Sequence, residues 1–225
     1  MVHVDSWVLN VIANVMASDE PITVRDIFFY PVKVLTGERL ASIQNRFGDA
    51  TNILTVFCNS RQVAKRKLTD AFGRATIEKN FDAFMGKISG GQPKVIEGVG
   101  GHVLSDHASP MLSIINLASV KDLERVTQKS VNSRRFRGNI LINGLAPWQE
   151  FDWIRKSVAI ADVYFSVTGR IDRCAATNVN PDTAEREMNI VASLKRGFDH
   201  IDMGVFIRVE TAGTIKAGAY LTPPT

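Results

Sequence analysis

Cysteine is scarce in this sequence. Among 225 residues there are two, Cys58 and Cys174. Two cysteines are too few for a disulfide framework, and neither belongs to a spacing that would bind zinc or an iron–sulfur cluster. The fold must therefore be stabilised by a hydrophobic core, which a chain of this length with 45% hydrophobic residues can form. We expect a reducing compartment.

Long apolar runs are also missing. The most apolar stretch, Trp7–Met16, is interrupted by Asn10 and Asn14 and is shorter than the ~20 residues that span a bilayer. Its apolar residues recur at helical spacing, which favours a helix with one buried stripe. We therefore expect no membrane partner and a cytoplasmic location. No histidine has metal-ligand spacing or an adjacent nucleophile, so we assign none to catalysis: His3, His102, His107 and His200.

Glycine-rich nucleotide loops are absent as well. The densest groups of turn-forming residues, 88–93 and 98–101, lack the Gly-x-Gly-x-x-Gly and Walker spacings. A linker or a barrel turn explains these groups better than a phosphate-binding loop. We place a domain junction there, with an abbreviated β/helical region at 1–95 and a second domain at 96–225.

Basic residues are in slight excess, with a net charge of +4, and they gather in two knots at 61–67 and 134–137. A basic patch with an interleaved aromatic residue, such as Phe136 in the second knot, is one signature of nucleic-acid binding. A solvated charged face is the alternative for both knots. Guanidinium groups also bind phosphate in bidentate fashion, which leaves a small anionic ligand open for the second knot.

The residue pattern predicts a mainly β fold, α+β overall, because short strands separated by glycine turns are typical of a barrel. We expect strands at 23–30, 51–58, 94–99, 111–116, 139–143, 157–167, 204–210 and 219–221. We expect helices at 38–47, 76–87, 120–127 and 186–196, the third with a capping box formed by Ser119 and Asp122.

Cys174 is the best candidate for chemistry. It follows Arg173, a permanent cation, and precedes the turn-forming run Asn178–Thr183. Such a position stabilises a thiolate and leaves it accessible. The alternative is that Cys174 is a small buried hydrophobic residue, which is the commoner role of an isolated cysteine.

Five segments of the chain, in this order, resemble the MOSC domain family, which is named after the C-terminal part of molybdenum cofactor sulfurase and is shared with the mitochondrial amidoxime-reducing component. These segments are Ser113–Ser119, Arg135–Asn139, Gly144–Trp153, Arg173–Thr177 with Asn180–Thr183, and Gly204–Phe206 with Gly213–Gly218. The resemblance runs from Ser113 to Leu221, about half of the chain.

The resemblance implies a MOSC-type β-barrel with a few peripheral helices that binds the molybdenum cofactor. Cys174 would be the catalytic residue and the thiolate ligand of molybdenum. The resemblance also implies pyridoxal phosphate binding as a property of the family. The residues implied at the cofactor are Arg173, Arg137, Asn139, Arg135, Asn116, Thr177 and Lys33. For Asn116 the alternative is a turn or cap residue at the end of a strand.

Local interpretations accompany three of these assignments. The hydroxyl of Thr177 could equally satisfy a local turn. Asn139 lies two residues after Arg137, which would place both side chains on one face of a strand. Lys33 belongs to a Tyr-Pro-Val-Lys motif that Val34 follows here, whereas longer relatives have serine at that place. The N-terminal β region is therefore expected to be shortened. The alternative for Lys33 is an exposed lysine at a strand end after a proline turn.

Three functions remain open. The first is an oxidoreductase that removes oxygen from N- or S-oxygenated small molecules and takes electrons from a separate donor protein, without nucleic acid as a partner. The second is a sulfur carrier that holds a persulfide on Cys174. The third is a non-catalytic module that binds the cofactor.

Overall fold

The computed structural model describes residues 21–27, 43–48, 51–58, 61–85, 93–95, 111–183 and 185–224. Several expected features lie outside these residues: the helix at 7–16, Lys33, and the glycines at 98–101. Lys94 and Val95 are described and are not in a strand, and the rest of the strand expected at 94–99 lies outside.

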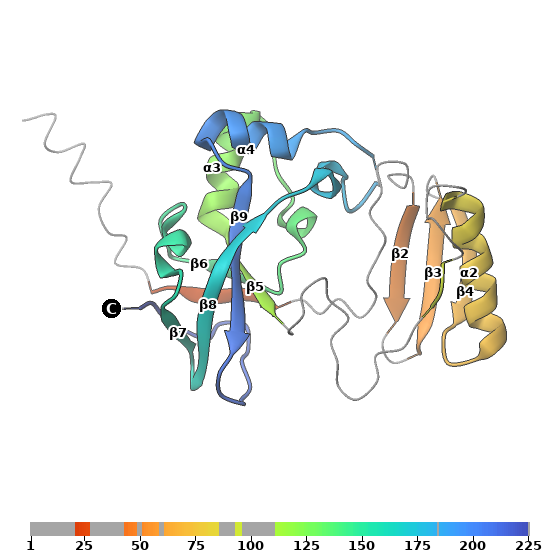
Figure 1. The fold of residues 1–225 in the computed structure, drawn as a ribbon, viewed down its shortest axis with the longest axis horizontal. Coiled ribbons are helices and arrows are strands. Elements are labelled where there is room, and N and C mark those ends of the chain that lie inside the picture. Colours follow the sequence, from red (N-terminus) through yellow and green to blue (C-terminus); the bar gives the residue numbers. More distant parts are fainter. Residues whose placement is uncertain are drawn as a thin grey trace, which may run out of the picture.

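Seven strands form one sheet in the order β1-β6-β5-β9-β8-β7-β10 (Figure 1). Their bounds are Thr23–Ile27 for β1, Leu112–Asn116 for β5, Ile140–Asn143 for β6, Ser157–Ile160 for β7, Val163–Asp172 for β8, Asp202–Val209 for β9 and Leu221–Thr222 for β10. Neighbouring strands of this sheet are antiparallel except β5 and β6, which are parallel.

Backbone hydrogen bonds join the two edges of this sheet. Val24 N donates to Ala219 O at 2.8 Å, Gly218 N donates to Val24 O at 2.7 Å, and Leu221 N donates to Ile22 O at 2.8 Å. The sheet is therefore a nearly closed β-barrel, which confirms the predicted fold class. β1 comes from the N-terminal part of the chain, so the barrel extends beyond the segment that begins at residue 96. The domain boundary itself stays a prediction.

The barrel strands bury residues on one or both faces. In β8 the alternate residues Val163, Phe165 and Val167 are buried in the barrel core, as period-2 patterning requires. β5 is buried on both faces, because Ile114 belongs to the barrel core and Ile115 belongs to a second cluster. The second cluster lies between the sheet and two helices.

These helices are α3 (Leu117–Thr127) and α4 (Ile190–Phe198), which pack against each other beside the barrel (Figure 1). The expected capping box at Ser119 is wrong. Asn116 is the N-cap of α3, since its side chain accepts a hydrogen bond from Ala118 N at 3.0 Å. Ser119 lies inside the helix and donates to a buried carboxylate. α4 also begins four residues later than the predicted helix.

A separate antiparallel sheet consists of β2 (Ile43–Gly48), β3 (Ile53–Cys58) and β4 (Arg61–Lys67), and α2 (Ala71–Met85) packs on it. Its own core contains Leu54, Val56, Ala64 and Ile77. The helix expected at 76–87 is confirmed, although it begins earlier. The first basic knot forms β4, an edge strand in which only Ala64 is buried, so its cations are solvent-exposed.

Two further expectations about elements are wrong. Residues 43–47, expected in a helix, form β2, because Phe47 pairs with Leu54 and Asn45 with Val56 across the sheet. The single strand expected at 157–167 is two strands, β7 and β8, separated by a turn at Ala161, whose φ is 50°. Within the described parts of the chain, no helix has the length and apolar character needed to cross a membrane.

Candidate active site around Cys174

Strand β8 delivers Cys174 to the surface of the barrel. The strand ends at Asp172, and after Arg173 the chain turns into a short 3-10 helix, η5 (Ala175–Asn178), with Cys174 at its N-cap position. The backbone there is fixed, since Thr177 N and Oγ1 both donate to Cys174 O, at 3.1 and 2.9 Å. The thiol is exposed and makes no capping hydrogen bond. The alternative of a buried hydrophobic cysteine is therefore wrong.

Arg173 points away from solvent. Its Nε donates to Met203 O at 2.9 Å, its Nη1 donates to Phe136 O at 2.9 Å, and its Nη2 also bonds Met203 O. Burial lowers the pKa of Arg173 to about 10, against the smaller opposing effects of Cys174, Asp172 and Asp202. The guanidinium thus binds backbone carbonyls and fixes the residue that precedes Cys174. Direct contact between Arg173 and a pterin stays a prediction.

The second basic knot forms a 3-10 helix, η3 (Ser133–Phe136), that lies against η5. Arg135 is buried, its Nη1 donates to Asn178 O at 3.1 Å, and its Nη2 pairs with Glu187. Arg135 Nε is buried and has no hydrogen-bond partner among the residues that the structure describes. Arg134 pairs with Asp182 at the surface. Arg135 therefore holds the segment after Cys174 and is not surface charge, whereas Arg134 lies at the surface, as the alternative expected.

Arg137 and Asn139 do not share a strand face, because β6 begins only at Ile140. Arg137 is the exposed C-cap of η3, with φ 48° in the left-handed region. Asn139 Oδ1 accepts hydrogen bonds from Ser113 N at 3.1 Å and from Ser113 Oγ at 3.0 Å. The expectation that one strand face presents both side chains is wrong, while their role at a cofactor stays a prediction.

Asn116 belongs to a buried polar network. Its Nδ2 donates to Ala146 O at 2.8 Å and to Glu150 Oε2 at 2.9 Å, and Ser119 Oγ donates to Glu150 Oε1 at 2.7 Å. Glu150 has no exposed surface, and this burial raises the pKa of its carboxyl although both hydrogen bonds lower it. Asn116 therefore caps α3 and binds an internal carboxylate, while its role at a cofactor stays a prediction.

The structure brings η3 and η5 together around Cys174, and it places Asn116 in the separate network. Sequence reasoning missed Glu150 and Glu187. Glu150 lies in the aromatic run Trp148–Trp153, but so does the exposed Asp152, so the run alone does not identify the buried carboxylate. Glu187 had no local signal, because its partner Arg135 lies 52 residues earlier in the chain.

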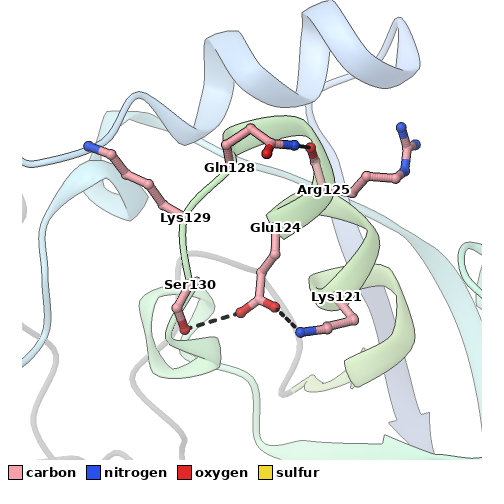
Figure 2. A pocket seen from close by; sticks show the side chains of 6 residues that line it. All are labelled: Lys121, Glu124, Arg125, Gln128, Lys129 and Ser130. Atoms are coloured by element: carbon pink, nitrogen blue, oxygen red, sulfur yellow. Dashed lines mark hydrogen bonds and ion pairs between the residues drawn. The ribbon is translucent and has the colours of Figure 1, made fainter.

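One surface hollow lies away from these residues, at the C-terminal end of α3 (Figure 2). Glu124 organises it: its carboxylate accepts hydrogen bonds from Lys121 Nζ at 2.8 Å and from Ser130 Oγ at 3.2 Å. These contacts and a hydrogen bond from Val131 N lower the pKa of Glu124. The polar side chains around this hollow thus bind one another at the solvent-exposed C-terminal end of the helix.

Residues 88–222 match the family model described as MOSC domain. The match covers more than half of the 225 residues, so the chain belongs to the MOSC domain family.

Two curated proteins illustrate the relationship. "Mitochondrial amidoxime-reducing component 1" from Mus musculus is 27% identical over 151 residues, which cover 62% of this chain and 44% of the mouse protein. "Molybdenum cofactor sulfurase" from Caenorhabditis elegans is 32% identical over 117 residues, which cover 50% of this chain and 16% of the worm protein. The relationship is distant, and the chain spans less than half the length of these relatives.

Among solved structures, YiiM from Geobacillus stearothermophilus aligns with a TM-score of 0.37 at 15% identity, covering 51% of this chain and 54% of that one.

Proposed function

We propose that this protein binds the molybdenum cofactor, with the Cys174 thiolate as a ligand of molybdenum, and that it reduces N- or S-oxygenated small molecules. The observation that carries the proposal is the exposed thiol of Cys174 on a backbone that is held on both sides. A relative named for amidoxime reduction and one named for the cofactor support it.

The donor set fits such a cofactor. In the described part of the chain, no group of three or more His, Cys, Asp or Glu side chains comes together to hold a metal ion. A single accessible thiolate suits a metal whose other ligands arrive with an organic cofactor, because thiolate is a soft donor. The exposed guanidinium of Arg137, at the end of η3, would meet the anionic part of that cofactor. When bound, the cofactor would supply the two-electron redox chemistry.

The overall reaction requires an electron source. Removing the oxygen from an N-hydroxylated compound consumes two electrons and two protons and releases water. Neither cysteine belongs to an iron–sulfur motif, so we propose that a separate protein donates the electrons. Pyridoxal phosphate binding stays a prediction, because no contact of the described residues bears on it.

A sulfur carrier is the second candidate. An exposed thiol that makes no capping hydrogen bond is also suited to hold and transfer a persulfide. One relative carries the name of a sulfurase. The two candidates differ in what the purified protein contains: molybdenum and a pterin in the first, and sulfur that dithiothreitol releases from Cys174 in the second. A non-catalytic module would contain the cofactor and show no turnover.

The test compares Cys174→Ser with Cys58→Ser in protein from a host that makes the cofactor. Cys174→Ser replaces a soft donor by a hard and largely protonated one at an exposed position, so the fold should persist. Reduction of an N-hydroxylated amidine by a chemical reductant should fall by more than about 100-fold, since even residues that only support a metal ligand are worth 10–100-fold. Cys58→Ser should retain activity. Equal loss in both variants would contradict ligation by Cys174.

A further inference from the structure

One short helix fixes the residues on both sides of Cys174. On the N-terminal side, Phe136 O of η3 accepts the hydrogen bond from Arg173 Nη1. On the C-terminal side, Arg135 of the same helix donates to the carbonyls of Thr177 and Asn178, at 3.5 and 3.1 Å. The Cys174 side chain has no capping bond, so the direction of the thiol depends on these backbone anchors.

The anchor on the C-terminal side depends in turn on Glu187. The side chain of Arg135 is 1% exposed, and its charge is paired with the Glu187 carboxylate, which is 41% exposed. The same Glu187 oxygen accepts a hydrogen bond from Asn180 Nδ2 at 2.8 Å. Removing one partner of a buried pair leaves an uncompensated charge, which is far more disruptive than breaking a surface pair.

Glu187 directly follows a loop that is closed by contacts between 179–180 and 185–186, and this loop begins five residues after Cys174. Asn180 N donates to Glu185 O at 2.8 Å, and a β-bridge pairs Val179 with Arg186. A shift of Glu187 therefore reaches the two carbonyls that Arg135 holds. These carbonyls lie only three and four residues after Cys174.

We propose that Glu187 is a positioning residue for Cys174: it pairs with the charge of Arg135, and Arg135 holds η5 so that the thiol is oriented toward the metal that it binds. This inference rests on the proposed function, since it takes Cys174 as the residue that binds molybdenum. Glu187 acts through Arg135 and is not itself a metal ligand in this proposal.

The chain offers a matched control in the same segment. Asp182 also pairs with an arginine of η3, but in this pair Arg134 is 46% exposed and Asp182 is 56% exposed. Exposed pairs contribute little because water screens them and their side chains lose entropy on pairing. Asp182→Asn therefore makes the same chemical change as Glu187→Gln without uncovering a buried charge.

The first measurement is amide hydrogen exchange in Glu187→Gln, Glu187→Asp and Asp182→Asn. Thr177 N and Val179 N, which donate to Cys174 O and Ala176 O, report on η5 directly. We expect exchange at 174–179 to rise by about 10-fold or more in Glu187→Gln, because a charge-assisted contact is lost, with β8 and β9 unchanged. Glu187→Asp should restore part of the protection, and Asp182→Asn should resemble the wild type.

The second measurement is molybdenum per polypeptide in the same purified proteins. Loss of an outer-shell support costs 10–100-fold in metal affinity, so Glu187→Gln should show a clear loss and Asp182→Asn none. A wild type without molybdenum would overturn the proposed function, while the exchange data would still decide whether Glu187 orders η5. The inference would be overturned if amide exchange in Glu187→Gln matched that in Asp182→Asn, or if it rose equally across the barrel. Raised local exchange with full molybdenum content would also overturn it.

Discussion

Substituting Gly204 by alanine should destabilise the barrel beside the site more than its small size suggests. Gly204 lies in β9 with φ +79°, and a Cβ there would lie 2.4 Å from Ile114 O and 2.5 Å from Ile115 Cδ1. A positive φ costs an L-residue about 1–2 kcal/mol. The contact with a backbone carbonyl cannot be relieved by a rotamer change, so β5 must move, which adds about 1–3 kcal/mol. We expect a loss of about 3 kcal/mol.

Two other glycines separate these contributions. Gly218 has φ +87°, and nothing lies within 4 Å of the place that a Cβ would occupy, so Gly218→Ala should cost only the conformational part, about 1–2 kcal/mol. Gly169 has neither feature, and Gly169→Ala should stay within about 1 kcal/mol of the wild type. The assay is guanidinium unfolding with the m-value checked in each variant. If the free energy of unfolding of Gly204→Ala is no lower than that of Gly218→Ala, the close contact with β5 is refuted.

The same substitution should reach the site. Gly204 follows Met203, whose carbonyl accepts two of the hydrogen bonds of Arg173. A shift of the β9 backbone would therefore disturb the residue before Cys174. Faster alkylation of Cys174 in Gly204→Ala than in Gly218→Ala, measured where both proteins remain folded, is the expected result.

Two more predictions concern charge. Arg137→Ala should lower molybdenum and pterin content about 10-fold or more, as expected for the loss of a charge-assisted contact, while Arg61→Ala on β4 should leave both contents unchanged. Oligonucleotide binding that weakens steeply with salt and depends on both arginines would instead support nucleic acid as the ligand. Burial raises the pKa of Glu150, so its contribution to stability is fully present below the ordinary carboxyl pKa and is lost as pH rises through the raised pKa. Glu150→Gln should remove this loss, so the free energy of unfolding of the variant in urea should rise relative to that of the wild type as pH rises. Asp152→Asn, an exposed change in the same turn, should show no such pH dependence.

Much of the barrel was predictable from local patterns. The alternation of Val163, Phe165 and Val167 predicts a strand with one buried face, and the structure confirms it. The helix expected at 38–47 is wrong over its described part, 43–47, for a physical reason. These residues pair with β3, which follows them in the chain, and such pairing overrides local propensity. The closure of the barrel, between 22–24 and 218–221, could not be predicted from any local pattern either.

The candidate site was predictable to a smaller extent. The neighbours of Cys174, a cation before it and turn-forming residues after it, predicted an accessible thiol but left a buried cysteine open, and the structure shows the exposed one. The tasks of Arg135 and Arg173 did not follow from their neighbours, because their acceptors are contributed by residues 30 to 52 positions away along the chain. A sequence pattern shows that a guanidinium is present and does not show which carbonyl or carboxylate it meets.

This difference decides how variants of the site should be interpreted. Loss of cofactor in an Asn116 variant would not establish contact, because Asn116 caps α3 and also binds the buried carboxylate of Glu150. Arg173 has the same ambiguity, since removing it leaves the carbonyls of Met203 and Phe136 without their donor. Exposed groups that the fold does not require give the cleaner evidence for binding. A site map should therefore begin from the exposed thiol of Cys174. A buried residue should be accepted as a contact only when cofactor content falls by more than the fraction of unfolded protein explains.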